Sequence, residues 1–222
     1  IIAEIAATSD DGSDVDTVSE LSAVIAQAVA DATAASLAVI SAYDGNNTLP
    51  TVDDYFNAGT TGMNDTRLAP VNSIMEQVAS SDSDTAAEIQ AVIDAYSLIL
   101  TAADSSPASG PVLALTAGGY ATLALGTLDT SAEVGLMNSV LAGRSQAQVD
   151  TYAELAAIAD VVSRMVEVAG GLIPSPALTL DDLALIGITG LDETNLAQFL
   201  SAIADTADTG SDIDSLAEMQ AI

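Results

Sequence analysis

Apolar side chains recur at three- and four-residue spacing along most of this chain, which is the period of a helix with one buried face. The pattern is clearest where Ile89, Val92, Ile93, Tyr96 and Leu100 share one stripe. Stripes with the same spacing are formed by Leu68, Val71, Ile74, Met75 and Val78, and by Leu196, Phe199, Leu200 and Ile203. The chain is therefore predicted to be all-α, with one of its helices over about 65–79.

Four helices are predicted to begin with the same motif, a Ser or Thr followed three residues later by Glu. It occurs in DTVSEL at 16–21, DTAAEI at 84–89, DTYAEL at 150–155 and DSLAEM at 214–219. In such a capping box the hydroxyl accepts a backbone N–H of the new helix, and the Glu accepts the N–H of the cap residue. Capping explains the spacing, so these carboxylates are interpreted as structural rather than catalytic. The predicted pairs are Thr17 with Glu20, Thr85 with Glu88, Thr151 with Glu154, and Ser215 with Glu218.

The boxed Glu residues follow one another at steps of 68, 66 and 64 residues, which indicates an internal repeat. A twelve-residue phrase repeats as well: TVDDYFNAGTTG at 51–62, a looser TAGGYATLALGT at 116–127, and TLDDLALIGITG at 179–190. We call these the first, second and third phrase. Each is predicted to start a short helix, and Gly59 and Gly187 are expected to supply the left-handed residue after the helices of the first and third phrases. The second phrase lacks both acids, so its helix is expected to be the weakest.

The repeat predicts a tandem array of three-helix modules with short joints that contain Pro and Gly. Each module would consist of a short helix, a Gly turn, a second helix, an acidic loop and a long helix. The last 24 residues align with the first 24 without a gap, so the chain is expected to be a window of a longer array. The predicted segments are a partial repeat at 1–49, two repeats at 50–110 and 111–175, and a partial repeat at 176–222. Pro50, Pro107, Pro111, Pro174 and Pro176 fall in the joints.

Charge and composition exclude several classes of function. The chain has 32 acidic residues against three basic ones, and its net charge is −29. Nucleic acid is excluded as a partner because phosphate binding needs Lys and Arg, and an anionic membrane surface would repel the chain. No 18-residue apolar run is free of charge, so no membrane insertion is expected. The chain has no Cys and no His, hence no thiolate nucleophile or imidazole base, and it is not expected to be an enzyme.

No cofactor is expected, and calcium is the one ligand for which the sequence offers candidates. Acidic loops precede three of the four capping boxes, and Asp and backbone carbonyls suit a hard cation. The spacing is not that of an EF-hand loop, however, and the matching loop AGRSQAQVD at 142–150 is nearly uncharged. A solvated loop that ends in a helix cap is the preferred interpretation. The candidate ligands under the alternative are Asp10, Asp11, Asp14, Asp16, Asp208, Asp212 and Asp214.

Two stretches carry a resemblance to a known kind of protein. PTVDDYFNAGTTG at 50–62 and DTAAEIQAVIDAY at 84–96 resemble the helical tandem repeats of giant bacterial extracellular surface and biofilm adhesins. The resemblance is close over 50–96 and 178–222 and looser over 111–160. It implies an exported protein, located outside the cell or on its surface, in which such repeats act as extenders or attachment arrays.

These observations predict a structural, non-catalytic extender segment of a large repetitive cell-surface protein, such as an adhesin stalk. Its partners would be neighbouring repeats of the same or an identical chain. Two alternatives remain open: a subunit of an extracellular filament or surface layer assembled by helix packing between chains, and a recognition module for a host or matrix protein. The filament alternative would leave an apolar stripe exposed on the isolated chain.

Overall fold

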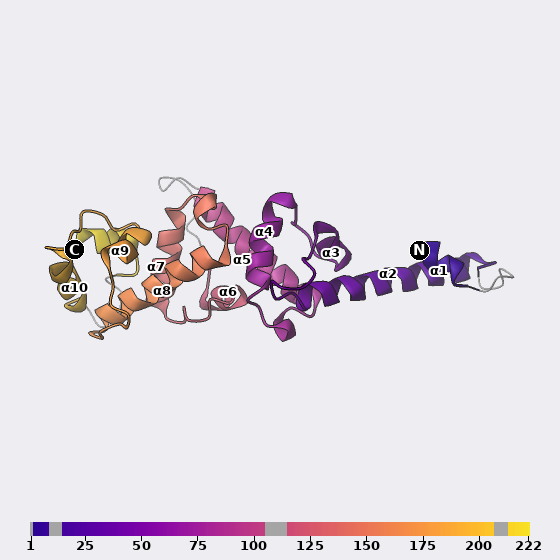
Figure 1. Cartoon of the computed structure of the whole chain (residues 1–222), viewed down its shortest axis with the longest axis horizontal. Coiled ribbons are helices and arrows are strands. Elements are labelled where there is room, and N and C mark those ends of the chain that lie inside the picture. Colours follow the sequence, from indigo (N-terminus) through magenta and orange to yellow (C-terminus); the bar gives the residue numbers. More distant parts are fainter. Residues whose placement is uncertain (1, 9–14, 105–114, 207–212) are drawn as a thin grey trace. The chain divides into compact units, whose positions relative to one another are not determined.

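A computed structural model describes residues 2–8, 15–104, 115–206 and 213–222 (Figure 1). Within these ranges the regular structure is entirely helical, with eleven α-helices, two short 3-10 helices and no strand. The all-α prediction is therefore confirmed. The chain divides into two compact units, one of residues 1–68 and 75–91, the other of residues 69–74 and 92–222. The boundaries of the units fall within two helices.

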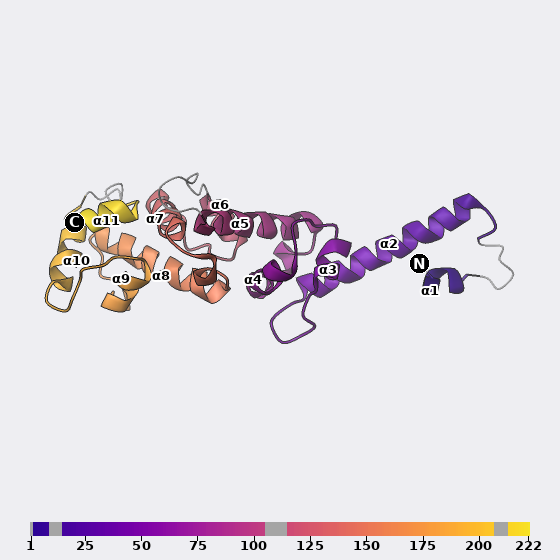
Figure 2. The same cartoon turned by 90° about the horizontal axis from the view of Figure 1, so that it is seen from above.

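The first unit is built around a long helix, α2 (Val18–Ser41). The short α1 (Ile2–Ala6) and α3 (Val52–Asn57) both pack against α2 (Figure 2). The start of α4 (Asp65–Met75), the 3-10 helix η1 (Ser80–Asp82) and the start of α5 (Ala86–Asp104) complete the unit. Its most deeply buried side chains include Ile40, Tyr55 and Ile89.

The second unit has its core around α8 (Tyr152–Ala169). Helix α7 (Ser131–Ala142) packs against α8, as do α9 (Leu180–Leu185) and α10 (Leu196–Ala204). Helix α11 (Leu216–Ala221) packs against α7. The unit also contains the middle of α4, most of α5, α6 (Ala117–Thr122) and the 3-10 helix η2 (Gln146–Gln148). Leu136, Leu155 and Val162 are completely buried in it.

Helix α4 is shorter than predicted. The apolar stripe suggested a helix to about residue 79, but α4 ends at Met75 and η1 follows it. The backbone tightens here, because the Val78 N–H donates to the Met75 carbonyl three residues back, at 3.2 Å. A 3-10 turn preserves the spacing of apolar residues over one turn, so periodicity alone does not mark the end of the helix.

Two of the described helices have the length and composition of a membrane-spanning segment. Helix α2 and residues 86–103 of α5 are both long and apolar enough to cross a bilayer when up to two charges are allowed. In α5 much of this apolar surface forms protein core, which accounts for its composition. In α2 only Ala28, Ser36 and Ile40 are buried.

Candidate functional site: recurring contacts between helices

The four predicted capping boxes all have both of their hydrogen bonds. In the box of α2, the Glu20 N–H donates to Thr17 Oγ1 at 3.2 Å, and the Thr17 N–H donates to Glu20 Oε2 at 3.0 Å. The boxes of α5, α8 and α11 have the same bonds at 3.0–3.3 Å. The hydrogen bond from Thr85 lowers the pKa of Glu88 below its usual value. These carboxylates are thus engaged with their own helix ends.

Three further boxes start α-helices and were not among the predicted pairs. They join Thr51 to Asp54, Thr130 to Glu133, and Thr179 to Asp182. In the second phrase Thr116 accepts only the Gly119 N–H, at 3.2 Å, since Gly119 has no carboxylate to return the bond. Helix α6 still has six residues, as do α3 and α9. The single cap is sufficient for a helix of that length in this context.

The Asp that closes the box in the first and third phrases also binds the preceding long helix. Arg164 of α8 lies fifteen residues before Thr179, and its Nη1 and Nη2 donate to the two carboxylate oxygens of Asp182 at 3.2 and 3.1 Å. Its Nε donates to Asp160 at 2.9 Å. Ser36 of α2 lies fifteen residues before Thr51, and its Oγ is 3.5 Å from Asp54.

The second phrase does not form this contact between its short helix and the preceding long helix. Thr101 holds the position fifteen residues before Thr116, but Gly119 offers no acceptor, and the Thr101 hydroxyl donates to the Ser97 carbonyl of its own helix. The donor and the acceptor therefore vary together among the three phrases. This pattern indicates a specific contact between a long helix and the short helix that follows it.

Arg164 is nearly buried and pairs with two carboxylates. Its side chain is 9% exposed and that of Asp182 is 23% exposed. Hydrogen bonds from Arg164 and, to a lesser extent, from Thr179 together lower the pKa of Asp182 to about 2. The pKa of Arg164 is raised, chiefly by its hydrogen bonds to Asp182. Bidentate pairing of this kind fixes orientation as well as contact.

A glutamine two residues after the boxed Glu ties the long helix to the phrase. Gln90 accepts the Thr61 N–H at 2.7 Å and donates to the Thr61 carbonyl at 3.3 Å. Gln220 makes the same pair of bonds with Thr189, at 3.2 and 3.1 Å. The second phrase again differs, with Ala156 and Gly126 at the matching positions.

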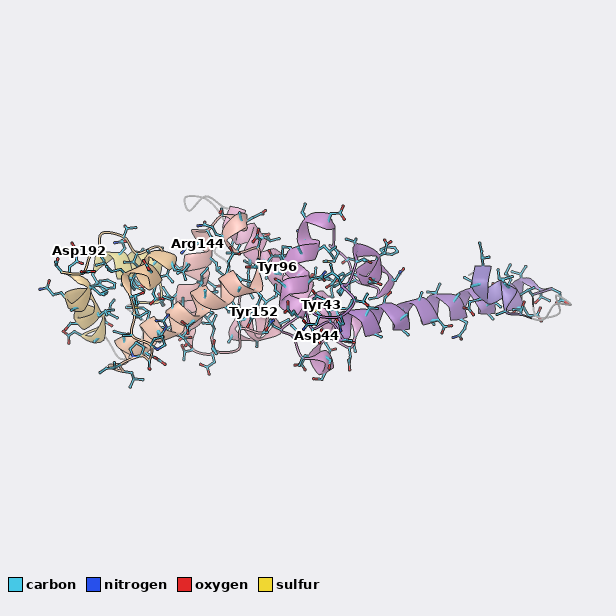
Figure 3. All side chains as sticks on the ribbon, in the orientation of Figure 1. Tyr43, Asp44, Tyr96, Arg144, Tyr152 and Asp192 are labelled. Carbon is cyan, nitrogen blue, oxygen red and sulfur yellow. The ribbon has the colours of Figure 1, made fainter. Side chains whose placement is uncertain are left out.

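Two serines link helices that are far apart in sequence. Ser73 Oγ of α4 accepts the N–H of Tyr152, the first residue of α8, at 2.9 Å (Tyr152 is labelled in Figure 3). Ser139 Oγ of α7 accepts the N–H of Leu216, the first residue of α11, at 3.0 Å. The pairs are 79 and 77 residues apart. Both serines use the first backbone donor of a boxed helix, which has no partner inside its helix.

A buried polar pair supports the second phrase. The Tyr120 hydroxyl donates to Asn138 Oδ1 at 2.7 Å, and Asn138 Nδ2 donates to the Leu115 carbonyl at 2.9 Å. Burial raises the pKa of the Tyr120 hydroxyl above its usual value. The third phrase has Leu183 in place of Tyr120. When Ser201 is aligned with Ser139, Leu200 stands in place of Asn138. Losing both polar groups together avoids a buried group without a partner, which is the costly case.

The predicted left-handed residues are present. Gly59 and Gly187 have φ of 91° and 92°. In the second phrase Ala124 takes this position with φ of 59°, which is unfavourable for a residue with a Cβ. Its carbonyl accepts the Tyr152 hydroxyl at 3.1 Å. Tertiary contact therefore compensates for the missing glycine.

The calcium candidates are described only in part. Asp10, Asp11, Asp14, Asp208 and Asp212 lie outside the described residues. Asp16 and Asp214 each precede a capping residue, and hydrogen bonds with them help to lower the pKa values of Glu20 and Glu218. In the described part of the chain, no group of three or more acidic side chains is placed to hold a metal ion.

A recess of about 350 Å³ lies beside α10 and α11. Its lining is mixed: Ile188, Leu191, Phe199, Ala202, Met219 and Ile222 are apolar, and Thr189, Asn195, Gln198 and Gln220 are polar. The recess contains no basic side chain and is open to solvent.

No protein-family model, curated protein or solved structure matches this chain.

Proposed function

We propose that this chain is a structural segment made of stacked three-helix modules, which extends a large cell-surface or extracellular protein. On this proposal the modules are α3–α4–α5, α6–α7–α8 and α9–α10–α11, and α1–α2 belong to a preceding one. The function is mechanical: each added module increases reach. The resemblance to the repeats of surface and biofilm adhesins supports the same assignment.

The observation that carries the proposal is the recurrence of one contact between consecutive modules. Ser73 in the second helix of one module accepts the first N–H of the long helix α8 in the next module. Ser139 repeats this contact with α11, one module further along. A contact that recurs between neighbours can be propagated along an array, as in other repeat proteins. A single globular domain gives no reason for the repetition.

The decisive experiment lengthens the chain by one period. Inserting a second copy of residues 89–154 after Glu154 adds 66 residues and preserves the phase of the repeat. We expect the longer chain to have the same helix content per residue by circular dichroism. Small-angle X-ray scattering should give a maximum dimension that grows by equal steps for one and two insertions. Misfolding of both insertion chains, or an increase as small as that of a growing sphere, would contradict the proposal.

The proposed location is tested separately. Brief protease treatment of intact producing cells should release peptides of this chain, because an extender outside the cell is accessible. Peptides that appear only after lysis would place the chain inside the cell and would leave the stacking proposal to the insertion experiment.

A further inference from the structure

The first turns of each long helix that follows a phrase are bound to the turn of that same phrase. In α5 the side chain of Gln90 makes two hydrogen bonds with the backbone of Thr61, and Gln220 of α11 repeats them. In α8 the Tyr152 hydroxyl takes this role and donates to the Ala124 carbonyl at 3.1 Å. The start of each of these helices is therefore held by its own module.

The second halves of the long helices are bound to the module that follows. In α8, Arg164 holds Asp182 of α9 with two hydrogen bonds. In α2 the Thr33 hydroxyl donates to the carbonyl of Asn57, the last residue of α3, at 2.9 Å. Both long helices also pack against the short helix of the next module. The bonds differ between the two helices, but each joins the second half of a long helix to the next short helix.

Helix α5 contacts the next module differently, since Gly119 of the second phrase offers no carboxylate. The Tyr96 hydroxyl donates to the Val149 carbonyl at 3.2 Å, in a buried hydrogen bond (Tyr96 is labelled in Figure 3). Gln146 Nε2 donates to the Leu100 carbonyl at 3.3 Å. Val149 and Gln146 both lie between α7 and α8. The second half of α5 is thus bound to the next module through the segment that precedes its long helix.

The division of the chain into compact units shows the same sharing of a long helix. Residues 86–91 of α5 group with the first unit, which contains the first phrase. Residues 92–104 group with the second unit, which contains the second phrase. A long helix is therefore not the last part of one module alone, because its two halves pack with different parts of the chain.

We propose that each long helix couples the stability of its own module to that of the next, so that neighbouring modules open together rather than one at a time. Helix formation is cooperative, so release of one half of a long helix favours fraying of the other half. Stability then contains a contribution from each pair of neighbours as well as from each module. For an extender, local opening is resisted along the array. The inference rests on the module equivalence of the proposed function and adds how neighbouring modules respond to a disturbance.

The test measures amide hydrogen exchange of the full chain by mass spectrometry. Leu183→Ala removes a buried side chain of α9, and the slowest amides of α9 and α10 should then exchange roughly thirtyfold faster or more. The slowest amides of α7 and of the first half of α8 should speed up by a similar factor, although they belong to the preceding module. The matched control is Leu185→Ala, which truncates an exposed leucine of the same helix and should change exchange in both regions by less than about threefold. Unchanged exchange in α7 and α8, beside faster exchange in α9, overturns the inference.

Two further variants test whether α8 carries the coupling. The same two modules also meet where Ser139 accepts the Leu216 N–H, so Ser139→Ala is combined with Leu183→Ala. The faster exchange in α7 and α8 should persist in this chain, and its disappearance would assign the coupling to the serine contact and overturn the inference. The reciprocal variant, Leu136→Ala, removes a completely buried side chain of α7 and should speed exchange in α9 and α10. It decides the question if Leu183→Ala does not fold, and unchanged exchange in α9 and α10 counts against the coupling. None of these outcomes affects the insertion experiment, which measures the length of the chain.

Discussion

Helices α2 and α8 begin with the same capping motif but differ in how far their apolar faces are buried. Each starts with a Thr–Glu box and carries apolar residues at helical spacing. In α8 these residues form the core, with Leu155 and Val162 completely buried. In α2, by contrast, Leu21, which follows the boxed Glu as Leu155 does, is exposed, as is Ile25. Caps and apolar periodicity therefore favour a helix but do not determine whether its apolar face is covered.

The largest expected effect comes from truncating the same position in both helices. Leu155→Ala should lower the free energy of unfolding by about 2–5 kcal/mol, because it removes packed methyl groups and leaves a cavity. Leu21→Ala at the matching exposed position should cost less than about 1 kcal/mol. Urea unfolding followed by circular dichroism measures both. Equal losses would mean that α2 is covered in solution at the concentration used.

A smaller effect is expected at Arg164 and Ser36, which each lie fifteen residues before the Thr that caps the next short helix. Arg164→Met should cost about 1–2 kcal/mol, less than a fully buried pair, because the Asp182 side chain is 23% exposed. Ser36→Ala should cost less than about 0.5 kcal/mol, since its contact with Asp54 at 3.5 Å is long. Thermal melts of the two variants provide the comparison, and a larger loss from Ser36→Ala would contradict it.

The same pair predicts how stability responds to acid. The pKa of Asp182 is lowered to about 2 in the folded chain, below the value of about 3.9 of an unfolded Asp. Its contribution to stability is therefore complete above about pH 4 and is lost as the pH falls towards 2. Arg164→Met should make the decline of stability between these pH values shallower. An unchanged pH profile would show that Arg164 does not control the carboxylate.

Removing the cap of α8 should lower the global stability of the fold, whereas removing the cap of α2 should loosen only the start of that helix. Thr151→Ala with Glu154→Ala is expected to cost about 1–2 kcal/mol, because α8 is part of the core. Thr17→Ala with Glu20→Ala removes the same bonds from α2, but the first turns of α2 are exposed. They should fray, with faster amide exchange at residues 18–21 and little change in the global melt. A global loss from the α2 variant comparable to that of α8 would oppose this distinction.

The smallest effect concerns the left-handed residue that follows each short helix. Ala124→Gly should stabilise the chain by roughly 0.5–1 kcal/mol, because glycine accepts a positive φ without the Cβ clash. Gly187→Ala should destabilise it by a similar amount. Chemical denaturation of the two variants should give shifts of opposite sign, and shifts of the same sign would refute the conformational explanation.

Much of the local structure could be predicted from the sequence. The caps of α2, α5, α8 and α11, the starts of the short helices and the left-handed Gly59 and Gly187 depend on groups within a few residues of each other. The hydrogen bonds of Gln90 with Thr61 and of Gln220 with Thr189 were not predicted. The sequence does show a pattern there, because each Gln lies two residues after a boxed Glu. The early end of α4 was missed because one 3-10 turn barely alters the apolar spacing.

The starts of the boxed helices follow from the sequence alone, because capping hydrogen bonds join groups that are three residues apart in the chain. What those helices contact depends on the tertiary structure. The bond of Ser73 with Tyr152 spans 79 residues, and that of Ser139 with Leu216 spans 77. Ala124 can hold a left-handed conformation because Tyr152 reaches its carbonyl. Burial depends on neighbours from other parts of the chain, which is why α8 forms a core and α2 has an uncovered face.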